Sequence, residues 1–322
     1  MILKKPKFWD YKKPNIFSLL LLPFTIPIRI NNFFNKFKKY INSHVHKHDD
    51  YRVKTICIGN IYLGGTGKTP MAIKINQILK ILGYKTSFIK KYYLKSYDEY
   101  KLLEKYGSVL SDNKRIKSLN EANKISDVAI FDDGLQDESI NYDLKFVCFN
   151  TKNFIGNGML IPAGPLREKI SSLKKYDAVF LNGNNESSNE ITSEIKKQNK
   201  NIKIFESTYS IVNLDKLDKK CKYVAFAGIG IPRNFNTSLT NNNINVVKFL
   251  EYPDHHIYDY DDIKNIKNIA KTLGARIITT EKDYTRLEIN KNPSLKENIQ
   301  FTKMELKIKN EDELINFLKT II

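Results

Sequence analysis

The sequence of 322 residues contains only three cysteines, Cys57, Cys148 and Cys221. Each lies in or beside an apolar, strand-like run, and none has the spacing of metal-ligating cysteines. This scarcity excludes a disulfide-stapled secreted domain and a cysteine-based zinc site. We expect the three thiols to be small buried side chains in a reducing compartment.

The sequence also lacks an apolar run that could span a bilayer as an uninterrupted helix, which takes about 20 residues. The uncharged run at residues 16–28 is interrupted by Pro23 and Pro27, with lysines before it and basic residues among phenylalanines after it. This pattern is typical of an interfacial anchor, whose lysines contact anionic head groups. Two alternatives stay open: a hydrophobic hairpin packed on the main domain, and a signal peptide, for which no small-residue cleavage site follows directly.

Acidic residues are few beside basic ones, 35 against 53, which gives a formal net charge of +18. Such charge suits nucleic acid, an anionic membrane or an anionic substrate. The sequence lacks the basic–aromatic clusters of a single-strand-binding groove, so we expect no nucleic-acid partner. His44, His46 and His48 alternate and could together bind a metal, but the charged residues around them favour a solvated linker.

The most informative segment that is present covers residues 53–83. An apolar, β-branched run is followed by a glycine-rich turn and then by helical periodicity from Pro70 to Leu82. Strand, glycine loop, Lys-Thr and helix together form a phosphate cradle, because backbone N–H groups and the helix N-terminus face the anion. We expect Lys68 on the outer phosphates and Thr69 on Mg²⁺. The predicted nucleotide-binding residues are Gly64, Gly65, Thr66, Gly67, Lys68 and Thr69.

One position departs from the strict form of this loop. Glycine is expected five residues before Gly67, where this sequence has Tyr62. The match is therefore to the second half of the motif. The alternative interpretation is a glycine-rich turn that only links a strand to a helix.

Further strands are expected at residues 127–131, 144–149 and 178–181. The first ends in Asp132-Asp133, and a carboxylate at this place beside a phosphate loop holds Mg²⁺ directly or through water. Alternation of strands with helical stretches predicts an α/β fold of the P-loop NTPase type, a mostly parallel sheet with helices on both faces. Residues 182–201 are expected to be a polar surface segment, helical at most in part.

A second unit begins near Tyr223. Strands are expected at residues 223–227, 244–249 and 276–279, with helices from Pro232 and over 261–273. We therefore expect three regions: an N-terminal interfacial helical anchor at 1–48, a P-loop kinase domain at 49–212, and a smaller C-terminal α/β domain at 213–322.

Several blocks, in the same order along the chain, resemble the tetraacyldisaccharide 4'-kinase family, the lipid A kinases of Gram-negative bacteria. The most specific are Pro-Ala-Gly-Pro-Leu-Arg-Glu at 162–168 and Pro-Asp-His at 253–255; the others lie at 64–69, 132–136, 225–230 and 279–283. The resemblance implies an ATP- and Mg²⁺-dependent kinase that phosphorylates the 4'-hydroxyl of a tetraacylated glucosamine disaccharide 1-phosphate. It also implies a peripheral or monotopic enzyme on the cytoplasmic face of the inner membrane, whose anionic surface suits the basic N-terminus.

The resemblance carries roles to individual positions. Four would be catalytic: Lys68, Asp132, Asp133 and His255, the histidine working with an aspartate on the sugar hydroxyl. Four would hold Mg²⁺: Thr69, Asp133, Gln136 and Glu168. Arg167 would pair with phosphate. The alternatives are that Arg167-Glu168 is an ordinary surface ion pair and that Asp254-His255 only orders a turn.

The sequence departs from the family's pattern where the partner of the histidine is expected. The family has an Asp-Arg pair there. If Arg115 aligns with the arginine of that pair, the position of the aspartate is occupied by Lys114, and Asp112 lies two residues before it. Three interpretations stay open: Asp112 takes this role, another carboxylate replaces it, or base catalysis is weak. A general base contributes about 10²–10⁴-fold to the rate, so its loss would slow transfer rather than abolish it.

Two other elements of the family's pattern match only in part. Its Arg-Gly-Tyr corresponds to Lys90-Lys91-Tyr92, and its Gly-Asp-Glu corresponds to Tyr97-Asp98-Glu99.

Two other functions stay open. One is a membrane-associated P-loop ATPase, which Leu63 disfavours because that class often has a lysine there. The other is a degenerate relative that binds nucleotide or lipid without turnover.

Overall fold

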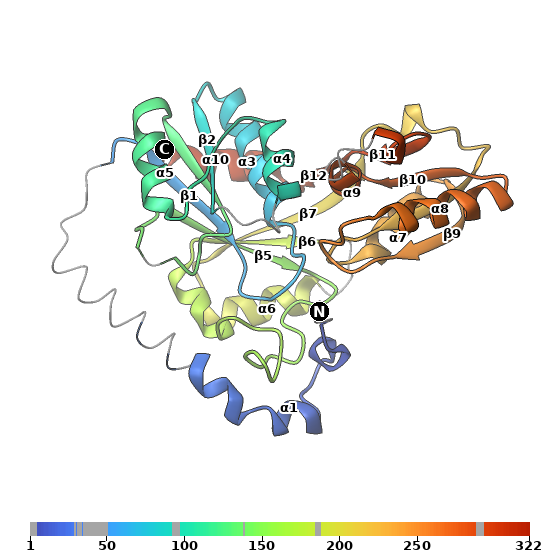
Figure 1. Ribbon diagram of the computed structural model, residues 1–322. Helices are drawn as coiled ribbons and strands as arrows, with labels where there is room; N and C mark the ends of the chain where they lie inside the picture. The colour runs from blue at the N-terminus through green and yellow to red at the C-terminus, as the bar shows by residue number, and fades with distance from the viewer. Residues whose placement is uncertain are drawn as a thin grey trace. The chain divides into compact units, whose positions relative to one another are not determined.

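The computed structural model describes residues 5–28, 30, 34, 51–91, 97–137, 139–183, 188–287 and 293–322. The chain forms two compact units (Figure 1). Unit 1 comprises Met1–Lys91, Gly107–Thr208 and Ile308–Ile322, and unit 2 comprises Tyr92–Tyr106 and Tyr209–Lys307. This division differs from the expected ranges in three respects: the N-terminal region is part of unit 1, a helix after the second strand belongs to unit 2, and the C-terminal helix belongs to unit 1. The histidines at 44–48 lie outside the described residues.

The larger sheet has eight strands in the order β12-β7-β6-β5-β1-β4-β2-β3. Every pairing from β3 through β7 is parallel, as predicted. The inner strands are almost continuously buried because helices cover both faces. The bounds are β1 Lys54–Gly59, β2 Thr86–Lys90, β3 Ser108–Leu110, β4 Val128–Asp132, β5 Leu144–Asn150, β6 Ala178–Asn182, β7 Lys203–Ile211 and β12 Met304–Ile308.

The helices of unit 1 divide between the two faces of this sheet (Figure 1). On one face, buried side chains of α5 (Arg115–Ile125) and α6 (Ser188–Gln198) join a single core cluster with alternate residues of β1, β4, β5 and β6. On the other face, Phe317 of α10 (Glu311–Lys319) packs against Phe146 and Phe205. The helix after the glycine loop, α3 (Lys68–Ile81), contributes no residue to the first cluster and packs on β1, β2 and β4.

The N-terminal segment is fixed to unit 1 through polar contacts. It contains the 3-10 turns Lys7–Asp10 and Pro23–Thr25 and the short helix α1 (Ile16–Leu20). The Trp9 indole donates to the carbonyl of Pro162 (3.0 Å), and the Asn157 amide donates to Ser18 Oγ (2.9 Å).

The apolar side chains of this segment are exposed rather than packed: Ile16, Phe17, Leu19, Leu20, Phe24 and Ile26 are each at least half exposed. A packed hydrophobic hairpin is therefore not what the described residues form. Among them, no helix is both long enough and apolar enough to cross a bilayer.

Unit 2 has a four-stranded, fully parallel sheet in the order β11-β10-β8-β9. Separate core clusters lie on its two faces, one including α8 and the other α7. The strand and helix positions expected after Tyr223 are confirmed within one or two residues. The bounds are β8 Lys222–Ala227, α7 Pro232–Asn241, β9 Asn245–Glu251, α8 Tyr260–Thr272, β10 Arg276–Thr280, α9 Glu281–Arg286, β11 Ile299–Thr302 and, from the inserted segment, α4 Tyr97–Glu104.

The three cysteines are free thiols. Cys57 and Cys148 are buried, and burial raises the pKa of Cys148 to about 12, so it stays protonated and unreactive at neutral pH. Cys221 is partly exposed, so the expectation of burial is wrong for this residue, which precedes β8 rather than lying inside it.

Candidate functional site

The glycine loop connects β1 to α3 and is braced from inside unit 1. Gly67 is the N-cap of α3 with φ 87°, a left-handed conformation that glycine adopts without strain. The fully buried Asn60 amide donates to the carbonyl of Gly64 (3.2 Å) and to Thr66 Oγ1 (2.9 Å). At the end of β6, the Asn182 amide donates to the carbonyl of Thr66. The first N–H groups of α3 have no intrahelical acceptor, so this end of the helix is open to an anion.

Tyr62, at the position where the strict motif has glycine, does not fill the loop. Its hydroxyl donates to Asp10 Oδ1 (2.5 Å) and accepts from Lys5 Nζ (2.8 Å). Its ring packs with Leu160 and Leu166. The residue therefore serves the contact between the N-terminal segment and the rest of unit 1, and one edge of its ring also lies against Gly64 of the loop.

The acidic strand end lies beside this loop because β4 pairs with β1, with Ile58 opposite Asp132. Asp132 is buried, and its Oδ2 accepts from Thr69 Oγ1 (2.9 Å) and from Lys90 Nζ (2.6 Å). Its other oxygen, Oδ1, is buried without a hydrogen-bond donor among the described residues.

Asp133 follows in a left-handed conformation, φ 62°, which turns the chain out of the strand. Its carboxylate lies 3.8 Å from Lys68 Nζ and 3.2 Å from Arg167 Nη1. The lysine of the loop and the second aspartate are thus close to each other.

Gln136, Arg167 and Glu168 form a connected network rather than a surface ion pair. The Gln136 amide donates to the carbonyl of Asn60 (3.0 Å) and to Glu168 Oε1 (3.2 Å), and its oxygen accepts from Arg167 Nη1 (3.2 Å). Glu168 is buried and accepts from the Tyr176 hydroxyl (3.1 Å). The alternative of an ordinary surface pair is wrong, because Arg167 contacts Asp133 and not its neighbour in sequence.

The oxygens at this corner suit Mg²⁺, a hard cation that prefers oxygen ligands and is usually held by one or two carboxylates together with substrate phosphates. Thr69 supplies a hydroxyl, and Asp132 supplies a buried oxygen without a donor. Within the described ranges, no three His, Cys, Asp or Glu side chains gather as a metal site of their own. Glu168 already lies 2.8 Å from Lys175 Nζ, which leaves it better suited to orient Gln136 than to bind metal directly.

His255 lies in unit 2, in a left-handed turn with φ 59° that follows β9. Its Nδ1 is 3.5 Å from Asp98 Oδ1, and its Nε2 is 3.9 Å from both Glu99 Oε1 and Asp254 Oδ1. Within unit 2 the carboxylate beside Nδ1 is therefore that of Asp98 on α4, which favours the alternative that another carboxylate takes the role considered for Asp112.

The segment expected to supply that partner has other contacts, all in unit 1. Asp112 accepts from the backbone N–H of Lys114 (3.1 Å). Arg115 donates to Asp137 Oδ2 (3.1 Å) and to the carbonyl of Asp133 (2.6 Å). Arg115 thus connects the start of α5 to the acidic turn after β4.

Asp98 is held by buried cations. Arg286 Nε donates to Asp98 Oδ2 (2.8 Å), Arg286 Nη2 lies 2.7 Å from the same oxygen, and Lys282 Nζ lies 3.6 Å away. Burial by itself would raise the pKa of Asp98, but the contact with His255 and the charges of Lys282 and Arg286 outweigh it and hold the pKa well below its usual range. Asp98 is therefore ionised at neutral pH. Its Oδ2 contacts Arg286, and its Oδ1 faces the imidazole of His255.

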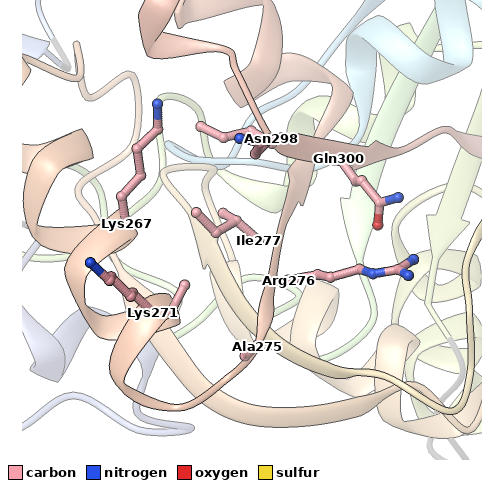
Figure 2. A pocket seen from close by; sticks show the side chains of 9 residues that line it. Lys267, Lys271, Ala275, Arg276, Ile277, Asn298 and Gln300 are labelled. Carbon is pink, nitrogen blue, oxygen red and sulfur yellow. The ribbon is translucent and has the colours of Figure 1, made fainter.

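Unit 2 also contains a cavity of about 570 Å³ at the amino ends of β10 and β11. Figure 2 shows Lys267 and Lys271 on α8 at one side, while Arg276 and Gln300 extend away from them. The cations do not converge, and Arg276 lies 3.5 Å from the carboxylate of Asp218. Ligands of open parallel sheets bind at the carboxyl ends of the strands, so this cavity is not the candidate site.

The chain matches a family model described as tetraacyldisaccharide-1-P 4'-kinase over residues 17–108 and 95–322. It is 50% identical over 320 residues to a tetraacyldisaccharide 4'-kinase of Pelagibacter ubique, covering 99% of this chain and 98% of the relative. It is 33% identical over 330 residues to one of Rickettsia canadensis, covering 96% and 94%.

The fold agrees with a solved structure, LpxK from Aquifex aeolicus in complex with ATP, with a TM-score of 0.70, 23% identity, and coverage of 95% of this chain and 99% of that one. The family's sequence blocks, the parallel sheet with its glycine loop, and these full-length relatives agree. The chain belongs to the tetraacyldisaccharide 4'-kinase family of lipid A biosynthesis.

Proposed function

We propose that this protein transfers the γ-phosphate of ATP to the 4'-hydroxyl of a tetraacylated glucosamine disaccharide 1-phosphate, with Mg²⁺ as cofactor. The observation that carries the proposal is the corner of unit 1 where the glycine loop, Lys68 and the Asp132-Asp133 turn meet. The curated relatives at 50% and 33% identity have this activity in their names.

In this proposal the loop residues 64–69 bind the triphosphate through backbone N–H groups and the N-terminus of α3. Lys68, now 3.8 Å from Asp133, exchanges that distant contact for phosphate oxygens. Thr69 and Asp132 would hold Mg²⁺, with Asp133 beside it, and the bound ion would neutralise charge on the transferred phosphoryl group. Arg167 adds a second cation at this turn, oriented by Gln136.

The Asp98–His255 pair is assigned to the proton of the acceptor hydroxyl. Asp98 stays ionised because Arg286 holds one of its oxygens, so it can orient the imidazole and stabilise it when protonated. Glu99 and Asp254 lie at similar distances on the Nε2 side of the ring and add to that stabilisation. Because phosphoryl transfer depends mainly on positioning and charge neutralisation, loss of this pair slows the reaction more than it affects nucleotide binding.

The experiment incubates the purified protein with γ-labelled ATP, Mg²⁺ and the disaccharide 1-phosphate in detergent. We expect label in the lipid, strictly dependent on the acceptor and lost in Lys68→Ala. ATP hydrolysis without labelled lipid would replace the proposal with a P-loop ATPase. Nucleotide binding without any turnover would replace it with a binding protein that has lost catalysis.

We further propose that the N-terminal segment places the enzyme on the anionic cytoplasmic face of the inner membrane. Phe17, Leu20 and Phe24 are 59%, 66% and 66% exposed, while the polar side of the segment contacts unit 1. Side chains in this position suit the acyl boundary of a bilayer, with the chain's lysines at the head groups.

Vesicles containing anionic phospholipid test this placement by sedimentation. The triple variant Phe17→Ser, Leu20→Ser, Phe24→Ser is expected to stay in the supernatant while it keeps nucleotide affinity. A control double variant, Ile81→Ser with Ile125→Ser, removes two other exposed apolar side chains, from α3 and α5, and is expected to sediment normally. Sedimentation of the triple variant at the wild-type level would contradict the proposal.

A further inference from the structure

The acidic end of β4 has a second lysine besides that of the glycine loop. Strands β2 and β4 are parallel neighbours, and their register places Lys90 directly opposite Asp132. Both are the last residues of their strands, so both side chains lie at the edge of the sheet that carries the phosphate loop. The position follows from strand pairing and not from a contiguous motif.

The contact between these two residues is short and buried. Lys90 Nζ lies 2.6 Å from Asp132 Oδ2, and the two side chains are 7% and 0% exposed. The same oxygen accepts from Thr69 Oγ1 (2.9 Å). A buried charge of either sign is costly without its partner, so each of these residues offsets the cost of burying the charge of the other.

This arrangement has a consequence for metal binding. Asp132 and Thr69 are the oxygens assigned to Mg²⁺, and an ammonium already occupies one of the carboxylate oxygens. A divalent cation that approaches Asp132 meets the repulsion of a positive charge only a few ångströms away. The other carboxylate oxygen, Oδ1, is buried and accepts from no donor among the described residues, so it is the oxygen of Asp132 that a metal would use, against the repulsion of Lys90.

We propose that Lys90 is a resident counter-ion of the metal carboxylate, which holds Asp132 in place before the metal–nucleotide arrives and raises the Mg²⁺ concentration that nucleotide binding requires. Lys90 is thus a positioning residue for the site described above. The inference rests on the proposed function only in that the loop binds a Mg²⁺–nucleotide.

The test measures the affinity of a fluorescent ADP for the full-length protein as Mg²⁺ is titrated, without any lipid. Lys90→Met keeps most of the side-chain volume and removes the charge. We expect the midpoint of the Mg²⁺ dependence to fall by about tenfold or more, as expected for removing one charge near the metal at an intermediate dielectric. Affinity at zero Mg²⁺ should stay within about twofold, because the lysine is placed on the carboxylate and not on the phosphates.

Two control variants separate this effect from general ones. Lys90→Arg keeps the charge and is expected to retain the wild-type midpoint. Lys74→Met removes a different lysine of unit 1, whose Nζ lies 2.7 Å from Glu311 Oε2, and is expected to leave the midpoint unchanged. An unchanged or higher midpoint in Lys90→Met, or a large loss of affinity without Mg²⁺, would overturn the proposal, the latter because it would place Lys90 on the phosphates.

A second readout does not require nucleotide. In metal-free buffer Lys90→Met is expected to melt at a lower temperature than the wild type, because Asp132 loses its buried partner. The double variant Lys90→Met with Asp132→Asn should recover most of that loss, because neither charge remains. A double variant no more stable than Lys90→Met would show that the ion pair does not hold this corner together. Neither readout uses the lipid, so failure of the kinase assignment leaves both interpretable.

Discussion

The phosphate corner of unit 1 and the His255 cluster of unit 2 are built in different ways. At the phosphate corner, Lys68 and Thr69 come from one contiguous loop, and Asp132 follows from the pairing of β4 with β1. In the histidine cluster, Asp98, His255 and Arg286 come from three segments far apart in the sequence. The first can be recognised from a motif, whereas the second exists only where the fold brings its parts together.

The two regions also use charge differently. At the phosphate corner, Lys68 Nζ lies 3.8 Å from the Asp133 carboxylate, beyond hydrogen-bond distance, so this lysine can turn to an incoming anion. In the histidine cluster, Arg286 is almost fully buried and bound to Asp98, Asp283 and the carbonyl of Gly228. The difference indicates that one region is prepared to exchange partners and the other to stay fixed.

The largest expected effect comes from removing Lys68, the cation that can exchange Asp133 for a phosphate oxygen. Lys68→Ala is expected to lower lipid phosphorylation by about 10³-fold or more, because both nucleotide binding and transition-state charge neutralisation are lost. Isothermal titration should show weakened nucleotide affinity in the same variant. Lys80→Ala, in the last turn of the same helix, is expected to match the wild type in both measurements. Full nucleotide affinity in Lys68→Ala would contradict the assignment of the loop.

A smaller and more selective effect is expected from the histidine cluster. His255→Ala is expected to lower transfer by about 10²–10⁴-fold, the usual contribution of a general base, with nucleotide affinity unchanged. His256→Ala is the matched control: its imidazole lies 2.7 Å from Asp262 at the start of α8 and is assigned no part in transfer. Equal activity losses in the two variants would remove His255 from the catalytic assignment.

Stability distinguishes the fixed region from the exchanging one. Arg286→Met is expected to lower the free energy of unfolding by about 3–5 kcal/mol, because Asp283 would stay buried without its cation and Asp98 would keep only the more distant Lys282. Arg276→Met removes a half-exposed arginine 3.5 Å from Asp218 and is expected to cost about 1 kcal/mol or less. Urea unfolding measures both, and similar values for the two variants would contradict the role given to the buried pair.

The smallest expected effect is a dependence of stability on acid pH. The pKa of Asp98 is lower in the folded chain than in the unfolded one, so its stabilisation is complete above the unfolded value of about 4 and is lost as pH falls toward the folded value. The loss is expected to be on the order of 2 kcal/mol. Urea unfolding from pH 5 downward should therefore fall more steeply in the wild type than in Asp98→Asn. Parallel slopes would mean that Asp98 is not the titrating group.

The sequence predicted the sheet where strands are apolar and the helices where periodicity is clear. The run at residues 127–131 became β4 (Val128–Asp132), and the run at 261–273 became α8 (Tyr260–Thr272). The polar segment at 182–201 is helical over α6 (Ser188–Gln198), stabilised by a few buried residues such as Ile195. Short or polar elements such as β3 and α4 were not predicted, because their stability comes from the neighbours on which they pack.

The site was predicted in part for the same reason. The structure places Thr69 and Lys68 of the glycine loop beside Asp132 and Asp133 at the neighbouring strand end, and the roles of these residues stay predictions. The partner of His255 was left open among three alternatives, since a sequence pattern cannot tell which helix packs against a distant turn; the structure places Asp98 of α4 beside the ring. Lys90 was noted only as a departure from a motif, because nothing short of strand register places it opposite Asp132.

By itself, the sequence determined the class of fold, the phosphate loop and the family, since these depend on local periodicity and on residues close together in the chain. Only the tertiary structure decided that Asp98 partners His255, that Lys90 pairs with Asp132, and that Phe17 and Leu20 are exposed. The physical reason is that burial and charge pairing are properties of packed surfaces, which chain segments distant in sequence create together.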